Sequence, residues 1–291
     1  MCQMKSGIIL KDRIFIPDYD SHTDMLAELG ISDTRQNAER LFIRAELLPP
    51  DGDVFAPVEE WSFHVDQDIL PDWYVEQVDK DRMVAAVKKW AKDRIHVGVD
   101  NLRISQGSNH YIKDCKDVVV CGSASISCVC GSASIGNVYD SASIGCVRSS
   151  ASIGYVYGSA SINYVCGSAS ISEVWGSASI GNVYDSASIG NVYDSASIGC
   201  VRSSASINYV YGSASIGEVY GSASISKVYG SASIGETKGQ AFIANSPYTR
   251  WEKQDALIIS ENATFKDNIN KIILQAGNWV FKKVGERNAD N

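Results

Sequence analysis

One pattern of polar and apolar positions, nine residues long, repeats thirteen times without a gap between Gly122 and Lys238. Each copy has the form (Gly/Asp/Ser)-Ser-Ala-Ser-Ile-x-x-Val-x, and the second to fifth positions are the same in every copy. The eighth position is Val in all copies except the last, where Thr237 closes the series. A strict period of this kind is typical of proteins built from stacked structural repeats.

The alternation inside each copy predicts a short β-strand. In residues 123–126 (Ser-Ala-Ser-Ile) the two serines point to one side of a strand, and Ala and Ile point to the other. A helix is excluded because Ser, Gly and β-branched residues dominate, and because a nine-residue spacing drifts around a 3.6-residue turn. Gly, Asp or Ser at the first position and Gly, Asn or Ser at the sixth predict chain corners at both places. An Asp at a corner, such as Asp140, is expected to be hydrated.

Two corners per copy give two sides, so we expect two copies to complete one coil. The ninth position supports this because even-numbered copies always end in an aromatic residue, whereas odd-numbered copies end in Cys, Arg, Tyr or Lys. Three copies per coil is the alternative, because residues 136–153 and 190–207 are identical and the spacing of this duplication, six copies, is divisible by both two and three. With two copies per coil the aromatic residues form one column along an edge, and we expect this column to be the binding site: Tyr139, Tyr157, Trp175, Tyr193, Tyr211 and Tyr229.

The expected fold is therefore mainly β, a parallel β-solenoid of nine-residue repeats with two repeats, or eighteen residues, per turn. Thirteen repeats make six and a half coils, and at about 4.8 Å per coil the rod is about 31 Å long. Stacked Ala, Ile and Val fill the core, and two columns of serine cover each broad face. Each repeat contacts only its neighbours, so both ends need caps.

Residues 1–99 differ from the repeats and predict a small α+β domain. Between Pro71 and His96 the spacing of Met83, Val87 and Ala91 predicts the apolar face of a helix. The other expected elements are a hairpin over Gly7–Ile16, a helix over Thr23–Leu29 capped by Ser21 or Thr23, and strands over Leu41–Leu47 and Trp61–Asp66.

Two further segments flank the repeats, which span residues 122–238. Residues 100–121 are expected to form irregular coils that cap the start of the solenoid. Residues 239–291 are expected to form a β cap at its far end, with a frayed tail over Gly285–Asn291. The strand-like clusters of this cap are Ala256–Ser260, Ile269–Leu274 and Trp279–Val284.

Composition and charge narrow the classes of function. The chain of 291 residues is 45% hydrophobic and has a formal net charge of −8, of which residues 1–115 carry −7 and the repeats −2. This acidic balance argues against a general affinity for nucleic acid or anionic membranes. No run approaches 18 apolar residues, and the segment from Met1 to Leu10 lacks the layout of a secretory signal, so we expect a cytoplasmic protein without membrane contact. The oligomeric state stays open.

Catalytic chemistry is weakly represented. The motifs His-Glu-x-x-His, Gly-x-Gly-x-x-Gly and Gly-x-Ser-x-Gly do not occur. His64 with Asp66 and Asp68 is the one constellation that suggests a metal or acid–base site, with Asp20 and His22 as further candidates. These polar residues alternate with apolar ones, as a half-buried strand requires in any case, and we favour that interpretation. We therefore expect no catalytic residue, no metal site and no cofactor.

The eight cysteines suggest a metal site or disulfides. Cys128, Cys130 and, one coil later, Cys146 could approach one metal ion. However, the cysteines of the repeats occupy the variable seventh and ninth positions, where they interchange with Tyr, Asn, Arg and Glu. This exchange indicates tolerated surface thiols, which we expect to be reduced and unligated.

Three kinds of protein share features with this pattern. The nine-residue period resembles the calcium-binding β-roll repeats of RTX toxins, but their liganding Asp and paired Gly are missing, so no calcium is implied. The Ala-Ser-Ile-Gly stretch resembles pentapeptide-repeat proteins, some of which mimic DNA against topoisomerases, although the period here is nine. The whole layout, with Trp61-x-Phe-x-Val-Asp66-Gln-Asp68 and Pro71-Asp-Trp73 before near-identical Ser-rich coils, resembles uncharacterised proteins of gut bacteria and their phages. That resemblance implies no activity.

The favoured hypothesis is a non-catalytic scaffold or binding protein, encoded by a phage or mobile element, whose rod sets a distance and whose aromatic column or end domains contact a protein partner. One alternative is ice binding through the regular hydroxyl columns, although Ser lacks the methyl group and the stiff rotamer of Thr. A second is an enzyme in the N-terminal domain that uses His64, Asp66 and Asp68. A third is acidic mimicry of nucleic acid by residues 1–115.

Overall fold

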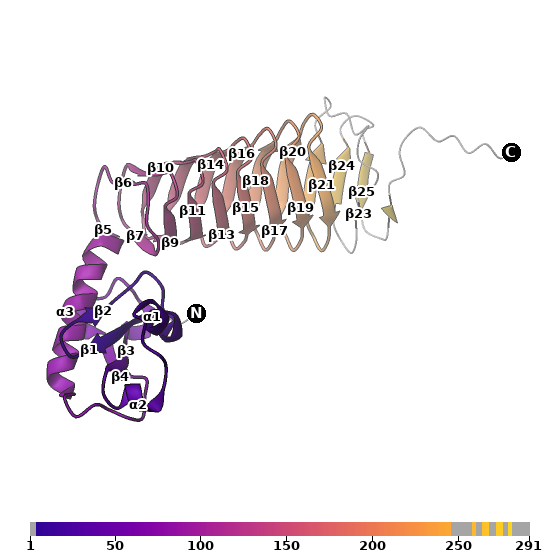
Figure 1. The fold of residues 1–291 in the computed structure, drawn as a ribbon. Coiled ribbons are helices and arrows are strands. Elements are labelled where there is room, and N and C mark those ends of the chain that lie inside the picture. The colour runs from indigo at the N-terminus through magenta and orange to yellow at the C-terminus, as the bar shows by residue number, and fades with distance from the viewer. Residues whose placement is uncertain (1–3, 246–257, 260–263, 268–271, 276–278, 281–291) are drawn as a thin grey trace. The chain divides into compact units, whose positions relative to one another are not determined.

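The chain forms two compact units, Met1–His96 and Val97–Asn291, in a computed structural model. The structure describes residues 4–245, 258–259, 264–267, 272–275 and 279–280 (Figure 1). The division falls three residues before the domain boundary that we expect from the sequence. Among the described residues, no helix combines the length and the apolar character that crossing a membrane requires.

The N-terminal unit is a four-stranded antiparallel sheet with helices packed against it. The strand order is β2-β1-β3-β4, and the hairpin expected near Asp12 joins the first two strands. Its elements are β1 (Lys5–Leu10), β2 (Ile14–Phe15), α1 (His22–Glu28), α2 (Arg35–Ala38), β3 (Phe42–Leu48), two 3₁₀ turns (Pro50–Gly52 and Val58–Glu60), β4 (Ser62–Val65) and α3 (Glu76–Arg94).

Alternation along β1 gives the sheet two buried faces. Ile8 packs with Met25 and Leu26 of α1 in one apolar cluster, whereas Gly7, on the other face, lies against Met83 of α3. α1 starts at its expected cap, because the Ser21 hydroxyl accepts a hydrogen bond from the backbone N–H of Asp24 at 3.3 Å. The two helices therefore cover opposite faces of the sheet.

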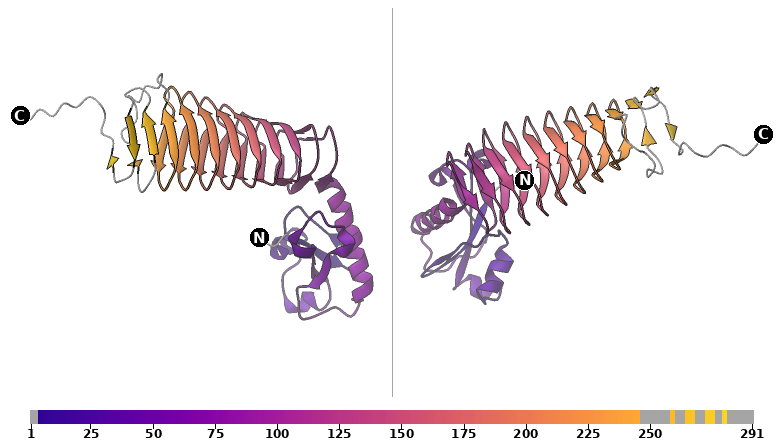
Figure 2. Two further views of the ribbon diagram at one scale, coloured as in Figure 1. Left: turned by 180° about the vertical axis from the view of Figure 1, so that it is seen from behind. Right: turned by 90° about the horizontal axis from the view of Figure 1, so that it is seen from above.

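The second unit is a parallel β-solenoid whose coils stack along one axis, with one sheet on each side (Figure 2). We name the two sheets after their members β10 and β9. The β10 sheet contains β6 (Arg103–Ile104), β8 (Val118–Val120), β10 (Ser134–Val138), β12 (Ser152–Val156), β14 (Ser170–Val174), β16 (Ser188–Val192), β18 (Ser206–Val210), β20 (Ser224–Val228), β22 (Phe242–Asn245), β24 (Thr264–Asp267) and β25 (Ile272–Gln275).

The β9 sheet has the same construction on the opposite side of the core. Its last pair, β23 with β26, is antiparallel, as is β24 with β25 in the β10 sheet. Its strands are β5 (Ile95–Val97), β7 (His110–Lys113), β9 (Ser125–Cys130), β11 (Ser143–Val147), β13 (Ser161–Val165), β15 (Ser179–Val183), β17 (Ser197–Val201), β19 (Ser215–Val219), β21 (Ser233–Thr237), β23 (Ile258–Ile259) and β26 (Trp279–Val280).

Two repeats complete each coil, as the sequence predicts. Ser134 pairs with Ser152 and Ile135 with Ile153, so equivalent residues two repeats apart lie in register on neighbouring strands. The odd-numbered repeats stack in the same way in the β9 sheet. Ala, Ile and Val of the repeats form one continuous buried core, with Ile exposed by at most 1%. The alternative of three repeats per coil is wrong.

The strands differ from the prediction in where they begin and end. Each strand of the repeats runs from the fourth to the eighth position, except β9, which ends at the ninth, so the sixth position lies inside a strand and the corner expected there is wrong. Ile135 and Val138 both point inward while the two residues between them point outward, which a local break in the alternation allows. Glycine occupies this place in eight of the thirteen repeats and lies close to the coil below, since a Cβ on Gly154 would lie 2.6 Å from the carbonyl oxygen of Gly136; the other repeats have Ser or Asn there.

The first position is a corner, as predicted, and it holds a positive backbone φ. The φ angles are 67° at Gly131 and 60° at Asp140. The serine of the second position is exposed in the same turn, and the serine of the fourth position begins the strand. Each broad face therefore carries one column of serine, and the expected second column lies at the corner instead.

The aspartates at these corners do more than stay hydrated. The Asp185 carboxylate accepts a hydrogen bond of 3.1 Å from the backbone N–H of Gly167, one coil below. Asp140 and Asp194 make the same bond, at 3.0 and 3.2 Å, to the glycines one coil earlier. Aspartate therefore links successive corners of the solenoid. Its side chain is short, it tolerates a positive φ, and its carboxylate accepts a hydrogen bond from a backbone N–H group of the neighbouring coil.

Replacing Asp185 by alanine is expected to lower the free energy of unfolding by about 1–2 kcal/mol, because alanine loses the bond to Gly167 and tolerates positive φ poorly. Asp185→Gly keeps the backbone freedom and should cost about 0.5–1 kcal/mol. The neighbouring exposed residue provides the matched control, Ser186→Ala, with a change within about 0.5 kcal/mol. Urea unfolding followed by circular dichroism measures all three; equal losses for alanine and glycine would contradict a role for the positive φ.

Candidate functional site

The aromatic column predicted from the sequence exists in the solenoid. Its six residues each follow a strand of the β10 sheet, at the corner between the two sheets, and consecutive members are two repeats apart. Stacking follows directly from the register, because neighbouring coils place equivalent side chains one strand spacing apart. The column consists of Tyr139, Tyr157, Trp175, Tyr193, Tyr211 and Tyr229.

The rings of the column stack in two runs, one of Tyr139 and Tyr157 and one from Trp175 to Tyr229. The ring centroids of Tyr193 and Tyr211 are 5.0 Å apart with planes 7° from parallel, and those of Tyr211 and Tyr229 are 4.7 Å apart at 9°. Trp175 approaches Tyr193 to 4.1 Å. Tyr139 and Tyr157 form the same contact at 5.1 Å and 5° near the N-terminal end. Such stacked contacts stabilise the edge beyond the burial of their surface.

A second aromatic position, which the sequence interpretation missed, widens the column onto the broad face. Tyr155 occupies the seventh position of its repeat and is 48% exposed. Together with Asn137, Tyr157 and Trp175 it lines a shallow, open hollow. The seventh position could have revealed it, because Tyr recurs there two positions before the column. Tyr209 takes the equivalent place beside Tyr211, with centroids 5.8 Å apart.

The electrostatics of the column favour uncharged rings. Desolvation against the neighbouring coils raises the pKa of Tyr157, Tyr193 and Tyr211 above the ordinary phenol value, so these hydroxyls are neutral at physiological pH. At the N-terminal end, the Arg103 guanidinium donates a hydrogen bond of 2.8 Å to the Tyr139 hydroxyl. The column is thus a neutral aromatic strip with a cation at one end.

The opposite edge has no comparable strip. There the ninth positions of the odd-numbered repeats interrupt aromatic residues with cations and thiols. Arg202 lies over the ring of Tyr184 at 4.9 Å and donates a hydrogen bond of 3.4 Å to the Tyr220 hydroxyl. The two edges of the solenoid are therefore chemically different, as the two-repeat period predicts.

The cysteines of the first repeats form a line of thiols at the β9 sheet. Cys128 lies in register with Cys146, whose sulfur is 3.8 Å from that of Cys166. The expectation of surface thiols is wrong for Cys128, Cys130 and Cys200, which are 4%, 5% and 8% exposed. A hydrogen bond to Cys128 and burial raise the pKa of the Cys130 thiol, so it stays protonated. The sulfurs follow one another in a row and do not converge on a common point.

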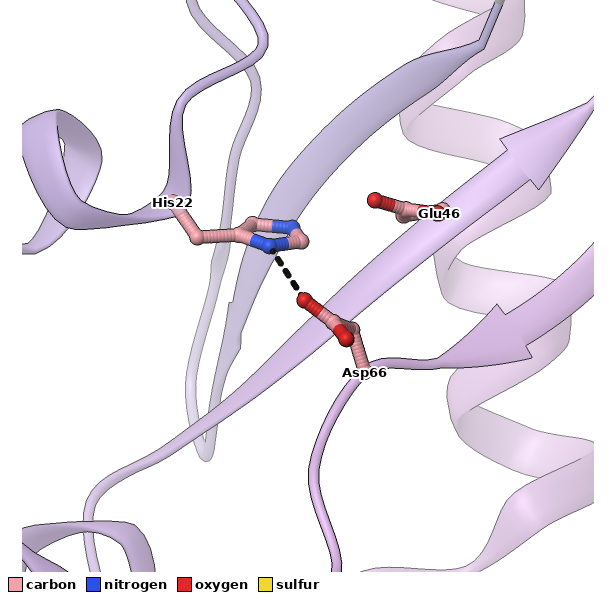
Figure 3. A group of neighbouring side chains, drawn as sticks. All are labelled: His22, Glu46 and Asp66. Carbon is pink, nitrogen blue, oxygen red and sulfur yellow. Dashed lines mark hydrogen bonds and ion pairs between the residues drawn. The ribbon is translucent and has the colours of Figure 1, made fainter.

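A different cluster of possible ligands lies in the N-terminal unit (Figure 3). In the described part of the chain, it is the one set of three His, Cys, Asp or Glu side chains whose ligand atoms all lie within 4.8 Å of one another. The cluster consists of His22 at the start of α1, Glu46 on β3 and Asp66 directly after β4. The Nδ1 atom of His22 is 3.1 Å from Oδ2 of Asp66.

The sequence constellation of His64, Asp66 and Asp68 is not the group that the fold assembles. Asp66 and His22 come together, but Glu46 completes the cluster in place of His64 and Asp68. Asp20 bonds to Lys5 instead. From the sequence, Glu46 shows only that it alternates with apolar residues along its strand, and its pairing with His64 across the sheet appears in the structure alone.

Comparisons with known proteins add no relationship. No family model, no curated protein and no solved structure matches the chain.

Proposed function

We propose that the protein is a non-catalytic scaffold that binds a protein partner through the aromatic column. The observation that carries this proposal is the alignment of six aromatic residues along one edge of the solenoid, where Tyr139 stacks on Tyr157 and Trp175 begins a second stack, and where Tyr157 and Trp175 are partly exposed. At about 4.8 Å per coil, the column is about 24 Å long. That length matches a protein-sized contact strip.

Three properties suit this surface to protein recognition. Tyr and Trp supply large contact areas with only two side-chain torsions to fix, and both are enriched at energetically important positions of interfaces. The rings are held by their stacking, so little freedom is left to lose on binding. The hollow beside Tyr155 offers a shallow recess for an apolar side chain of the partner.

A pair of deletions tests the column as a whole. The one-coil deletion removes residues 176–193, so Trp175 meets Tyr211 and the column stays continuous with five members. The one-repeat deletion removes residues 176–184 and moves every later repeat to the opposite sheet. The column is then split, with three of its six members on each edge, although Ala, Ile and Val of the core still stack.

The full chain and both deletion variants serve as baits in a lysate of the source organism, and mass spectrometry quantifies the captured proteins. We expect the one-coil deletion to retain the proteins that the full chain captures, and the one-repeat deletion to lose them by about tenfold or more. Circular dichroism verifies that both variants fold. Equal capture by the two variants, or no enriched protein on the full chain, would contradict the proposal.

The proposal includes the setting of the gene, which we place in a phage or mobile element. The support is the layout of the sequence, in which a small N-terminal unit precedes near-identical repeats and residues 136–153 recur unchanged as 190–207. The genes on either side test this part independently, and housekeeping neighbours would contradict it.

A further inference from the structure

We propose that His22, Glu46 and Asp66 bind a divalent transition metal ion, with Zn²⁺ as the best match. The site lies in the N-terminal unit and is independent of the aromatic column. It brings together one imidazole and two carboxylates from three separate elements of the chain.

The spacing of the ligand atoms fits one ion. Two ligands of a tetrahedral zinc ion, each about 2.0–2.1 Å from the metal, lie about 3.3 Å apart. His22 Nδ1 and Asp66 Oδ2 are 3.1 Å apart, and the Glu46 carboxylate lies within 4.8 Å of both ligand atoms. Small side-chain rotations would therefore bring all three groups to one ion, with a further position open to solvent beside Asp66, whose side chain is 61% exposed.

The hydrogen-bond partners of His22 determine which of its ring nitrogens would bind the metal ion. Its Nε2 atom lies 3.3 Å from the backbone carbonyl oxygen of Ala45, which can only accept a hydrogen bond, so Nε2 is the donor in this contact. In the neutral ring, Nδ1 then presents its lone pair to the Asp66 carboxylate. An ion between the two groups turns this opposed pair of acceptors into two ligands. A histidine whose second nitrogen donates to a backbone carbonyl is the usual arrangement around protein-bound metals.

A second, independent observation comes from Ser6. It lies opposite Glu46 in the ladder between β1 and β3, so the two side chains are neighbours on one face of the sheet. Ser6 is 0% exposed, and its hydroxyl has no hydrogen-bond partner among the described residues. A buried hydroxyl is rarely left without a hydrogen-bond partner. A water molecule bound to a metal ion at Glu46 would supply one.

The donor set selects the kind of ion. One nitrogen and two carboxylate oxygens suit zinc and similar transition metals, whereas Ca²⁺ and Mg²⁺ prefer oxygen ligands alone. The two carboxylates balance the charge of a divalent cation. Among divalent metals with this donor set, affinity rises from Mn²⁺ to Co²⁺, and Zn²⁺ also exceeds Mn²⁺.

Titration of the full chain with Zn²⁺ by calorimetry, and with Co²⁺ by absorption spectroscopy, tests the site. Co²⁺ separates it from the thiols, because thiolate ligands add strong near-ultraviolet charge-transfer bands that nitrogen and oxygen ligands do not. The test variants are His22→Ala and Asp66→Asn. The matched control is Asp68→Asn, which makes the same change as Asp66→Asn at an exposed carboxylate outside the cluster.

We expect the full chain and Asp68→Asn to bind one Zn²⁺ equally and to give Co²⁺ spectra without thiolate bands. Asp66→Asn and His22→Ala should weaken zinc binding by about tenfold or more. Asp66→Asn keeps the test decisive if His22→Ala fails to fold, because its side chain is exposed and nearly unchanged in shape. The proposal is overturned if zinc does not bind below about 100 µM, if Asp66→Asn binds as tightly as the full chain, or if only thiolate bands appear.

Discussion

Replacing Ile171 by alanine is expected to lower the free energy of unfolding of the solenoid by about 2–5 kcal/mol. Ile171 is 1% exposed at the inward-facing fifth position of its repeat, on β14, and it stacks between Ile153 and Ile189 of the neighbouring coils. Alanine leaves a cavity that strands above and below cannot fill, because their register is fixed by backbone hydrogen bonds on both sides. The loss therefore combines the transfer free energy of the missing atoms with the cost of the cavity.

The adjacent outward-facing residue gives the matched control. Ser170→Ala changes a half-buried side chain on the same strand and should shift stability by no more than about 0.5 kcal/mol. Ile171→Val should fall between the two, at about 0.5–1.5 kcal/mol. Denaturant unfolding of the full chain, followed by far-ultraviolet circular dichroism, measures the three variants. Similar losses at Ile171 and Ser170 would show that the strand faces are not as described.

Replacing Asp20 by alanine is expected to destabilise the N-terminal unit by about 2–4 kcal/mol. Lys5 is 1% exposed, and its ammonium group donates to the Asp20 carboxylate at 2.7 Å and to the carbonyl of Tyr19 at 3.1 Å. Burial lowers the pKa of Lys5, and the hydrogen bond and charge of Asp20 oppose that shift. Without Asp20, the ammonium group stays buried beside Trp90 and loses its closest counter-charge. The expected loss is below that of a fully buried pair because the Asp20 side chain is 37% exposed.

A double variant separates the ion pair from other effects of the mutation. Lys5→Met with Asp20→Asn removes both charges and retains most of the volume, so it should recover much of the stability lost in Asp20→Ala. Asp12→Asn changes an exposed carboxylate in the hairpin turn and serves as the control. Thermal unfolding monitored by the near-ultraviolet signal of tryptophan follows this unit in part, because three of the six tryptophans, Trp61, Trp73 and Trp90, lie in it and the other three lie in the second unit. A double variant as unstable as Asp20→Ala would contradict this account.

The solenoid could be predicted closely from the sequence because its period is strict. Even and odd repeats differ at one position, and that difference alone separates two repeats per coil from three, as the pairing of Ile135 with Ile153 confirms. The strand ends are harder to predict. Two outward residues stand between Ile135 and Val138, and a simple alternation cannot distinguish a break of this kind inside a strand from a corner. The residue pattern therefore favours a turn at the sixth position, although the glycines there serve close coil stacking.

The cluster in the N-terminal unit depends on tertiary placement that the residue pattern does not contain. His22 and Asp66 are 44 residues apart, and they meet only because α1 begins beside the strands β3 and β4. Alternation predicts the outward side chains of each strand but not which loop or helix end faces them. Sequence proximity groups Asp66 with His64 and Asp68, whereas the fold groups it with residues from other elements. The same limit explains why Glu46 was missed.

Every coil of the repeats presents the same Ala, Ile and Val side chains for stacking. A coil that has just formed could therefore stack on the coil next to it in the sequence or, equally well, on a coil one turn away from that one. Stacking on the wrong level would expel whole turns as loops, and the entropy cost of closing such loops grows only slowly with their length. The coils before residue 122 break this ambiguity, since Val118 and Val120 pair with Ile135 and Val138 in a sequence context that no repeat shares. If folding starts at these first coils and adds one coil at a time, each repeat can take only its native place. We therefore expect the solenoid to fold from its N-terminal end toward its C-terminal end, the order in which the ribosome synthesises it.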